Sequence, residues 1–248
     1  MRNSIFWGYV FCYLLFCFAH LQILLFSPRL PVLILFLFFL VIYTLTVLGN
    51  LGMILLIRID SQLHTPMYFF LANLSFVDVC NSTTITPKML ADLLSEKKTI
   101  SFAGCFLQMY FFISLATTEC ILFGLMAYDR YAAICRPLLY SLIMSRTVCL
   151  KMAAGAFAAA LLNSMVNTSY VSSLSFCGSN VIHHFFCDIS PVLKLASQHS
   201  GFSQLVIFML GVFALVIPLL LILVSYIRII SAILKIPSSV GRYKTFST

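Results

Sequence analysis

The 248-residue chain is 62% hydrophobic and 9% charged, with a formal net charge of +8. Soluble domains carry roughly 25% charged residues, so the composition excludes a soluble domain and predicts an integral membrane protein. The positive charge does not indicate nucleic-acid binding, because the longest basic run is Lys97-Lys98. The lysines and arginines are instead expected to determine how the chain is oriented in the lipid bilayer.

The first thirty residues form an atypical apolar N-terminal extension. Residues 5–26 are long enough for a sixth span, or they form a signal-like segment flanked by Arg2. His20 and Gln22 interrupt the apolar run, and no clean cleavage pattern follows it. Both interpretations of this segment stay open.

Five apolar segments after residue 30 are each long enough to cross a bilayer, which takes about 20 helical residues. They are predicted at about 31–57, 66–90, 104–128, 148–170 and 202–234. Short polar connectors join them, except for one long loop before the last segment, and no internal repeat is visible. The sequence therefore predicts one all-α domain over residues 31–248, a polytopic helical membrane bundle.

The third segment separates Cys105 from Arg130 by about 37 Å of helix, more than the ~30 Å hydrocarbon core. More lysines and arginines fall on the Arg130 side, which favours a cytosolic location for that side and an N-terminus outside. Cys105 then lies on the oxidising side, where a disulfide persists. Cys177 and Cys187 in the long loop are candidate partners, and a free buried thiol is the alternative.

Asp129 and Arg130 place two opposite charges at the cytosolic end of the third segment. Arg130 suits the helix C-terminus electrostatically, whereas Asp129 does not. One interpretation is an interfacial pair that marks the membrane boundary. The other is a two-state latch, closed when the charges pair and open when Arg130 turns to a partner.

Ordered motifs are distributed over about residues 27–248. They are MAYDRYAAICRPLLY (126–140), GN (49–50), LHTPMYFFLANLSFVDVC (63–80), TPKML (86–90), SFCGSNVIHHFFCD (175–188), SY (225–226) and KTFST (244–248). The set closely resembles vertebrate odorant receptors, a branch of the rhodopsin-like G-protein-coupled receptors.

The resemblance implies a rhodopsin-like seven-helix fold in the plasma membrane, no enzymatic activity, and no cofactor. It implies that Asp129, Arg130 and Tyr131 restrain the inactive state, and that Arg130 engages a heterotrimeric G protein on activation. It also implies a disulfide between Cys105 and Cys187. A metal site formed by His184, Cys187 and Asp188 competes with that disulfide, and we favour the disulfide.

Three polar residues lie at membrane depth, namely Asn50, Asp78 and Glu119. Such groups are costly in hydrocarbon, so they are expected to face the bundle interior. If they converge, they can hold a cation or a water cluster, and the resemblance implies a sodium-like allosteric site. The alternative is a hydrogen-bonded polar knot without an ion.

A ligand pocket is expected in the outer half of the bundle. Residues at i, i+3, i+4 spacing on the third segment form one wall, and residues outward of Pro218 on the fifth form the other. They are Met109, Phe112, Ile113, Ala116 and Thr117, with Leu210, Gly211 and Ala214 opposite. This apolar lining with a lone hydroxyl suits a small volatile organic molecule, although ordinary helix packing explains each residue singly.

Two of the departures from the family pattern lie in the long loop and at the C-terminal end. Ser197 stands where the family carries a cysteine, which leaves Cys177 without its expected partner. The chain also ends at KTFST, where the family's sixth helix begins. We therefore expect a truncated chain that does not couple ligand to G protein alone. The alternative function is a non-signalling membrane fragment, retained in the endoplasmic reticulum or associated with intact receptors.

Overall fold

The computed structural model describes residues 32–176, 180–196 and 201–234, and within these ranges the regular secondary structure is helical. The long helices are α2 (Val32–Ile59), α3 (Pro66–Leu94), α4 (Phe102–Cys135), α6 (Arg146–Ser172) and α8 (Gly201–Leu234). Short elements connect them: η1 (Ser61–Leu63), η2 (Pro137–Leu139), α5 (Tyr140–Ile143) and α7 (Ile189–Leu193). The N-terminal extension and Cys177 lie outside the described residues.

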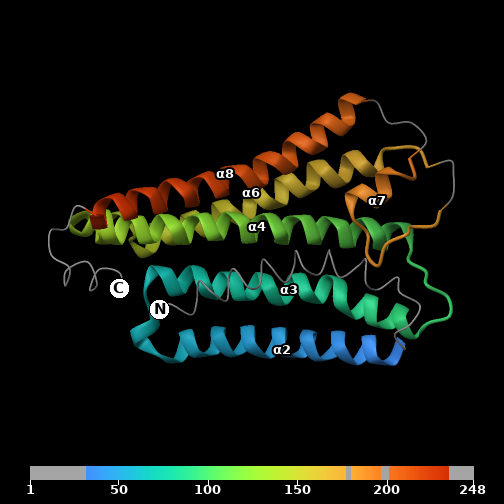
Figure 1. Cartoon of the computed structure of the whole chain (residues 1–248), viewed down its shortest axis with the longest axis horizontal. Coiled ribbons are helices and arrows are strands. Elements are labelled where there is room, and N and C mark those ends of the chain that lie inside the picture. The colour runs from blue at the N-terminus through green and yellow to red at the C-terminus, as the bar shows by residue number, and fades with distance from the viewer. Residues whose placement is uncertain (1–31, 177–179, 197–200, 235–248) are drawn as a thin grey trace.

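The helices α2, α4 and α6, together with Met209–Leu234 of α8, are long and apolar enough to span a membrane. Helix α3 has 29 residues but a more polar composition, because it carries buried side chains such as Asp78 and Asn81. It nevertheless lies between α2 and α4 in the bundle (Figure 1). The predicted class, an all-α polytopic membrane bundle, is confirmed.

Local sequence explains where the central helices begin. Pro66 opens α3 at a position where its missing N–H costs no hydrogen bond. Ser101 precedes α4, and its hydroxyl oxygen accepts from the N–H of Gly104 at 3.1 Å. Farther along α3, Pro87 removes one backbone hydrogen bond.

Helix α4 is the centre of the bundle, since α3, α6 and α8 all pack against it while α2 packs on α3 (Figure 1). Small residues let α6 approach closely: Ala156, Ala160 and Ser164 recur every fourth position and are all buried. The Ser164 hydroxyl donates to the carbonyl of Tyr110 in α4. On the other side, Gly124 of α4 lies directly against Pro218 of α8.

Three clusters of buried side chains lie in the described part of the bundle, and two of them, named cytosolic and outer after the orientation predicted from the sequence, lie toward its opposite ends. The cytosolic cluster joins α3, α4 and α6 and includes Phe70, Val77 and Leu122. The outer cluster joins α4 and α6 to the long loop and includes Met109 and Val171. Helix α4 therefore has one end packed against the long loop and the other against the connectors η2 and α5.

Candidate functional site

The N-terminal end of α4 is covalently attached to the long loop. Cys105 and Cys187 form a disulfide, with Cα atoms 5.3 Å apart, and both residues are buried. This pairing leaves Cys187 unavailable as a metal ligand beside His184. The ring of His184 instead stacks on Phe185, and its Nδ1 lies 3.0 Å from the carbonyl oxygen of Phe186.

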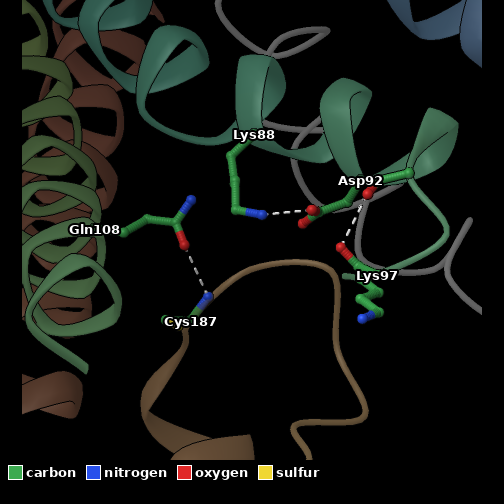
Figure 2. Close-up of polar contacts among 6 residues, drawn as sticks. Lys88, Asp92, Lys97, Gln108 and Cys187 are labelled. Atoms are coloured by element: carbon green, nitrogen blue, oxygen red, sulfur yellow. Dashed lines mark hydrogen bonds and ion pairs between the residues drawn. The ribbon is translucent and has the colours of Figure 1, made fainter. Parts of the chain in front are cut away.

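Gln108 adds a second attachment at the same place, which the sequence analysis missed. Its Oε1 accepts from the N–H of Cys187 at 3.1 Å, and its Nε2 donates to the Thr84 carbonyl at 3.0 Å. Figure 2 shows this side chain directed at Cys187, with the Lys88–Asp92 ion pair of α3 nearby. In the sequence, the one indication of this role is a glutamine one helical turn after Cys105. Its hydrogen-bond partners Cys187 and Thr84 are known only from the fold.

We expect Gln108→Ala to lower the free energy of unfolding by about 2–3 kcal/mol, because two buried hydrogen bonds are lost together. Thermal unfolding of the purified chain in detergent measures this loss. Gln62→Ala is the matched control, since Gln62 is an exposed glutamine of η1. An equal loss of stability in the two variants would contradict the role assigned to Gln108.

The polar groups at membrane depth form a buried cluster, but its amide comes from a different residue than expected. Asn81 Nδ2 donates to Glu119 Oε1 at 3.0 Å, and the carboxyl groups of Asp78 and Glu119 also hydrogen-bond. Asn50 instead donates to the Thr46 carbonyl of its own helix. We define Asp78, Asn81 and Glu119 as the polar core.

Asn81 gives the polar core an acceptor without a partner. Its Oδ1 is buried and has no hydrogen-bond partner among the described residues. The polar core therefore offers one amide oxygen and two carboxyl groups in a confined space. Oxygen atoms of this kind are the ligands that hard cations prefer. The donor set thus fits a small cation or a water molecule.

The C-terminal end of α4 carries the Asp129-Arg130-Tyr131 triplet. Asp129 is 3% exposed, and its Oδ1 accepts from the Tyr140 hydroxyl at 2.9 Å. Arg130 directs Nη2 toward Met67 Sδ at 4.0 Å, and no ion pair joins Arg130 to Asp129 in the described ranges. The hydrogen bond to Asp129 therefore comes from the connector after α4, whereas Arg130 acts on Asp129 through its charge.

Tyr140 is suited to this role because it remains a donor. Burial, followed by the nearby charge of Asp129, raises the pKa of its phenol well above the ordinary value. The hydroxyl consequently keeps its proton throughout the physiological range. Tyr140 belongs to the quoted MAYDRYAAICRPLLY motif, but sequence spacing alone does not show that the chain folds back to Asp129.

The predicted ligand-contacting residues of α4 have different surroundings. Met109 is fully buried in the outer cluster. The Thr117 hydroxyl oxygen accepts a hydrogen bond from Asn163 Nδ2 of α6 at 3.3 Å. The ring of Phe112 packs edge-on against Phe186 of the long loop, with centroids 4.9 Å apart. Ile113 packs at the border of the outer cluster, and Ala116 is half-buried.

The predicted ligand-contacting residues of α8 are more open. Leu210 and Ala214 are half-buried, and Gly211 is exposed with no neighbouring atom where a Cβ would lie. Met109, Phe112 and Ile113 of α4 all lie on the side of the long loop, whereas Thr117 accepts a hydrogen bond from Asn163 of α6. The assignment of these positions to a ligand pocket stays a prediction.

Sequence comparisons agree with these features. A family model described as "Olfactory receptor" matches residues 39–248. The chain is 78% identical over 215 residues to olfactory receptor 5F1 of Homo sapiens, an alignment that covers 87% of this chain and 68% of that protein. It is 64% identical to human olfactory receptor 10K1, with 87% and 69% covered. It is 51% identical to olfactory receptor-like protein COR6 of Gallus gallus, with 86% and 69% covered.

Both the extent of the family match and the level of identity place the chain among these receptors. The match includes all of the polar core and the triplet, and it reaches from α2 through α8. The chain belongs to the olfactory receptor family.

Proposed function

We propose that this chain provides the odorant-sensing and G-protein-facing parts of a receptor in the plasma membrane, with its N-terminus outside. As a member of the olfactory receptor family it is a multi-pass membrane protein and not an enzyme. The ligand is a small volatile organic molecule, held between α4 and α8 beneath the long loop. Phe112, Ile113, Leu210 and Ala214 supply an apolar lining that favours dispersion and burial over hydrogen bonding.

The observation that carries this proposal is the arrangement of functional groups along α4. One end bears the disulfide to the outer loop, and the other bears the triplet. The 25 residues from Cys105 to Arg130 correspond to about 37 Å of helix, so a single rigid element links the outer face to the cytosolic face. A ligand that shifts the outer loop thereby displaces the triplet.

The hydrogen bond between Tyr140 and Asp129 defines the resting state in this proposal. It keeps the connector η2–α5 against the end of α4 and leaves Arg130 beside Met67. When the connector moves away, Arg130 becomes available to a heterotrimeric G protein. The two states thus differ in the partner of each charged side chain, and this difference lets a ligand shift their populations.

We propose a second role for the polar core, namely a sodium-sensitive brace between α3 and α4. The unpartnered Asn81 Oδ1 supports this, because a cation coordinated by Asn81, Asp78 and Glu119 would satisfy it. The bound ion would supply positive charge between two carboxyl groups that otherwise repel when ionised. It would therefore hold α3 and α4 in one relative position.

The test of the main proposal uses this chain joined to the remaining C-terminal part of olfactory receptor 5F1, expressed in cells. A panel of volatile organic compounds is applied, and the second-messenger rise is recorded. We expect a ligand-evoked response that Arg130→Ala abolishes. Arg136→Ala is the control, since Arg136 is an exposed arginine at the same end of α4. A response that survives Arg130→Ala would overturn the proposed role of the triplet.

The alternative proposal is a non-signalling membrane fragment. Sequencing the native transcript across both ends of the reading frame separates the two possibilities. A frame that continues into further apolar spans supports the receptor. A frame limited to this chain, together with retention in the endoplasmic reticulum, supports the fragment.

A further inference from the structure

A groove of about 960 Å³ opens at the cytosolic end of the bundle, the same end that carries the triplet. It is bordered by the end of α2, the connector η1, the beginning of α3 and the beginning of α6. Helix α3 contributes a continuous stripe at i, i+3, i+4, i+7 spacing, consisting of Phe69, Ala72, Asn73 and Phe76. The groove therefore follows one face of α3 from the connector into the membrane.

The end of the groove at the connector is basic. Arg58, His64 and Arg146 line it, all three are exposed, and no lining residue is acidic. Within the described part of the chain, neither arginine has a carboxylate at ion-pairing distance. The neighbouring Asp60 is not part of the lining, and its Oδ1 accepts from the Gln62 N–H. This end of the groove thus presents donors without intramolecular acceptors.

The other end of the groove is apolar. Ile54 of α2 lines it together with Phe69 and Phe76 of α3, and Phe76 is 53% exposed. Phe76 lies ten residues after Pro66, which corresponds to about 15 Å along the helix into the hydrocarbon layer. A cytosolic peptide would leave backbone groups without hydrogen bonds at that depth. The depth and polarity instead match an amphipathic molecule with an acyl chain.

We propose that this groove binds an anionic phospholipid of the cytosolic leaflet. The phosphate and acidic headgroup contact Arg58, Arg146 and His64, and one acyl chain lies along Phe69, Ala72 and Phe76. Guanidinium groups bind phosphate oxygens through paired hydrogen bonds, which favours an anionic headgroup over a zwitterionic one. The proposal rests on the orientation given under the proposed function, but not on ligand sensing or G-protein coupling.

Such a lipid would add a connection between α2 and α6, which both pack on α3. The lining residues Arg58 and Arg146 belong to these two helices, and a shared phosphate would join them. Occupancy would consequently stabilise the packing of α2 on the remaining bundle. Helix α2 packs mainly on α3, so it is the helix that gains most from a second attachment.

The test is a lipid titration of the purified 248-residue chain in detergent, followed by its melting temperature. The probes are short-chain phosphatidylserine, short-chain phosphatidylcholine and glycerophosphoserine, which is the headgroup without acyl chains. We expect saturable stabilisation by phosphatidylserine alone. The double variant Arg58→Gln/Arg146→Gln should weaken the apparent affinity for phosphatidylserine roughly tenfold or more.

The matched control is Lys151→Gln/Arg228→Gln, which removes two exposed charges of the same bundle end outside the groove. It should retain the affinity within about twofold. Phe76→Ser should also weaken phosphatidylserine binding, since it removes the apolar wall while changing no charge. Equal weakening by both double variants, equal binding of phosphatidylcholine, or equal binding of glycerophosphoserine would each overturn the proposal. Because no signalling is measured, these outcomes do not depend on the receptor assay.

Discussion

Glu119→Leu is expected to lower the free energy of unfolding by about 3–5 kcal/mol, the largest loss from a single side chain in this bundle. Glu119 is buried in α4, where it accepts from Asn81 and hydrogen-bonds to Asp78 of α3. Leucine would leave both α3 side chains without these partners in an apolar environment, where unsatisfied polar groups are costly. In detergent, the melting temperature should decrease by roughly 10 °C or more.

Two controls separate the loss of hydrogen bonds from general effects. Glu119→Gln keeps the size and an amide oxygen that can accept from Asn81, so it should remain close to the unsubstituted protein. Glu96→Leu makes the same chemical change at an exposed position between α3 and α4 and should have little effect. If Glu96→Leu proves as destabilising as Glu119→Leu, the polar core does not hold α3 to α4.

The same variants test the sodium proposal. Replacing potassium by sodium at constant ionic strength should raise the melting temperature of the unsubstituted protein. Glu119→Gln should abolish this difference, since it removes a carboxylate ligand while retaining the hydrogen bond to Asn81. A sodium effect that persists in Glu119→Gln would exclude Glu119 as a ligand and favour a polar knot without an ion.

Gly124→Leu should separate α4 from α8. A Cβ atom built at Gly124 lies 3.5 Å from both Cα and Cβ of Pro218, which is ordinary van der Waals contact. Alanine therefore fits, whereas the additional carbon atoms of leucine must displace the backbone of Pro218. Forcing extra carbon atoms into a packed contact costs about 1–3 kcal/mol, and we expect melting in detergent to show this loss.

Two other glycine substitutions serve as controls for this prediction. Gly124→Ala should be tolerated. Gly155→Leu should leave the stability unchanged, because Gly155 lies on the exposed face of α6 with open space around it. Crosslinking between cysteines introduced on α4 and α8 gives a second measurement, which should decrease in Gly124→Leu alone. Unchanged crosslinking and stability in that variant would show that the helices do not pack through Gly124 and Pro218.

Much of the architecture was predictable from the sequence because long apolar segments leave few alternatives in a bilayer. Each of the predicted segments 31–57, 66–90, 104–128, 148–170 and 202–234 overlaps one long helix, although most helices extend beyond the predicted ends. The helix predicted from residue 104 to 128 continues to Cys135 and so includes Asp129 and Arg130. Helix ends of this kind depend on capping and on contacts beyond the apolar region, which hydropathy does not report.

The partners of the polar residues were harder to predict. Sequence position indicated that Asp78 and Glu119 lie inside the bundle, but it did not identify Asn81 as the amide beside them. Arg130 is the neighbour of Asp129 in the chain, but in the structure the hydrogen bond to Asp129 comes from the Tyr140 hydroxyl. Adjacent side chains on a helix point in different directions, so a neighbour in sequence is often a poor hydrogen-bond partner.

The sequence by itself determined the membrane environment, the helical class and the family, because each follows from composition, segment length or ordered motifs. The tertiary structure decided the contacts that give those residues roles: Gln108 beside the disulfide, Tyr140 on Asp129, and the basic groove between α2 and α6. These features join segments far apart in the chain. Their formation depends on how helices pack and on where connectors fold back, and neither is encoded in any local pattern of residues.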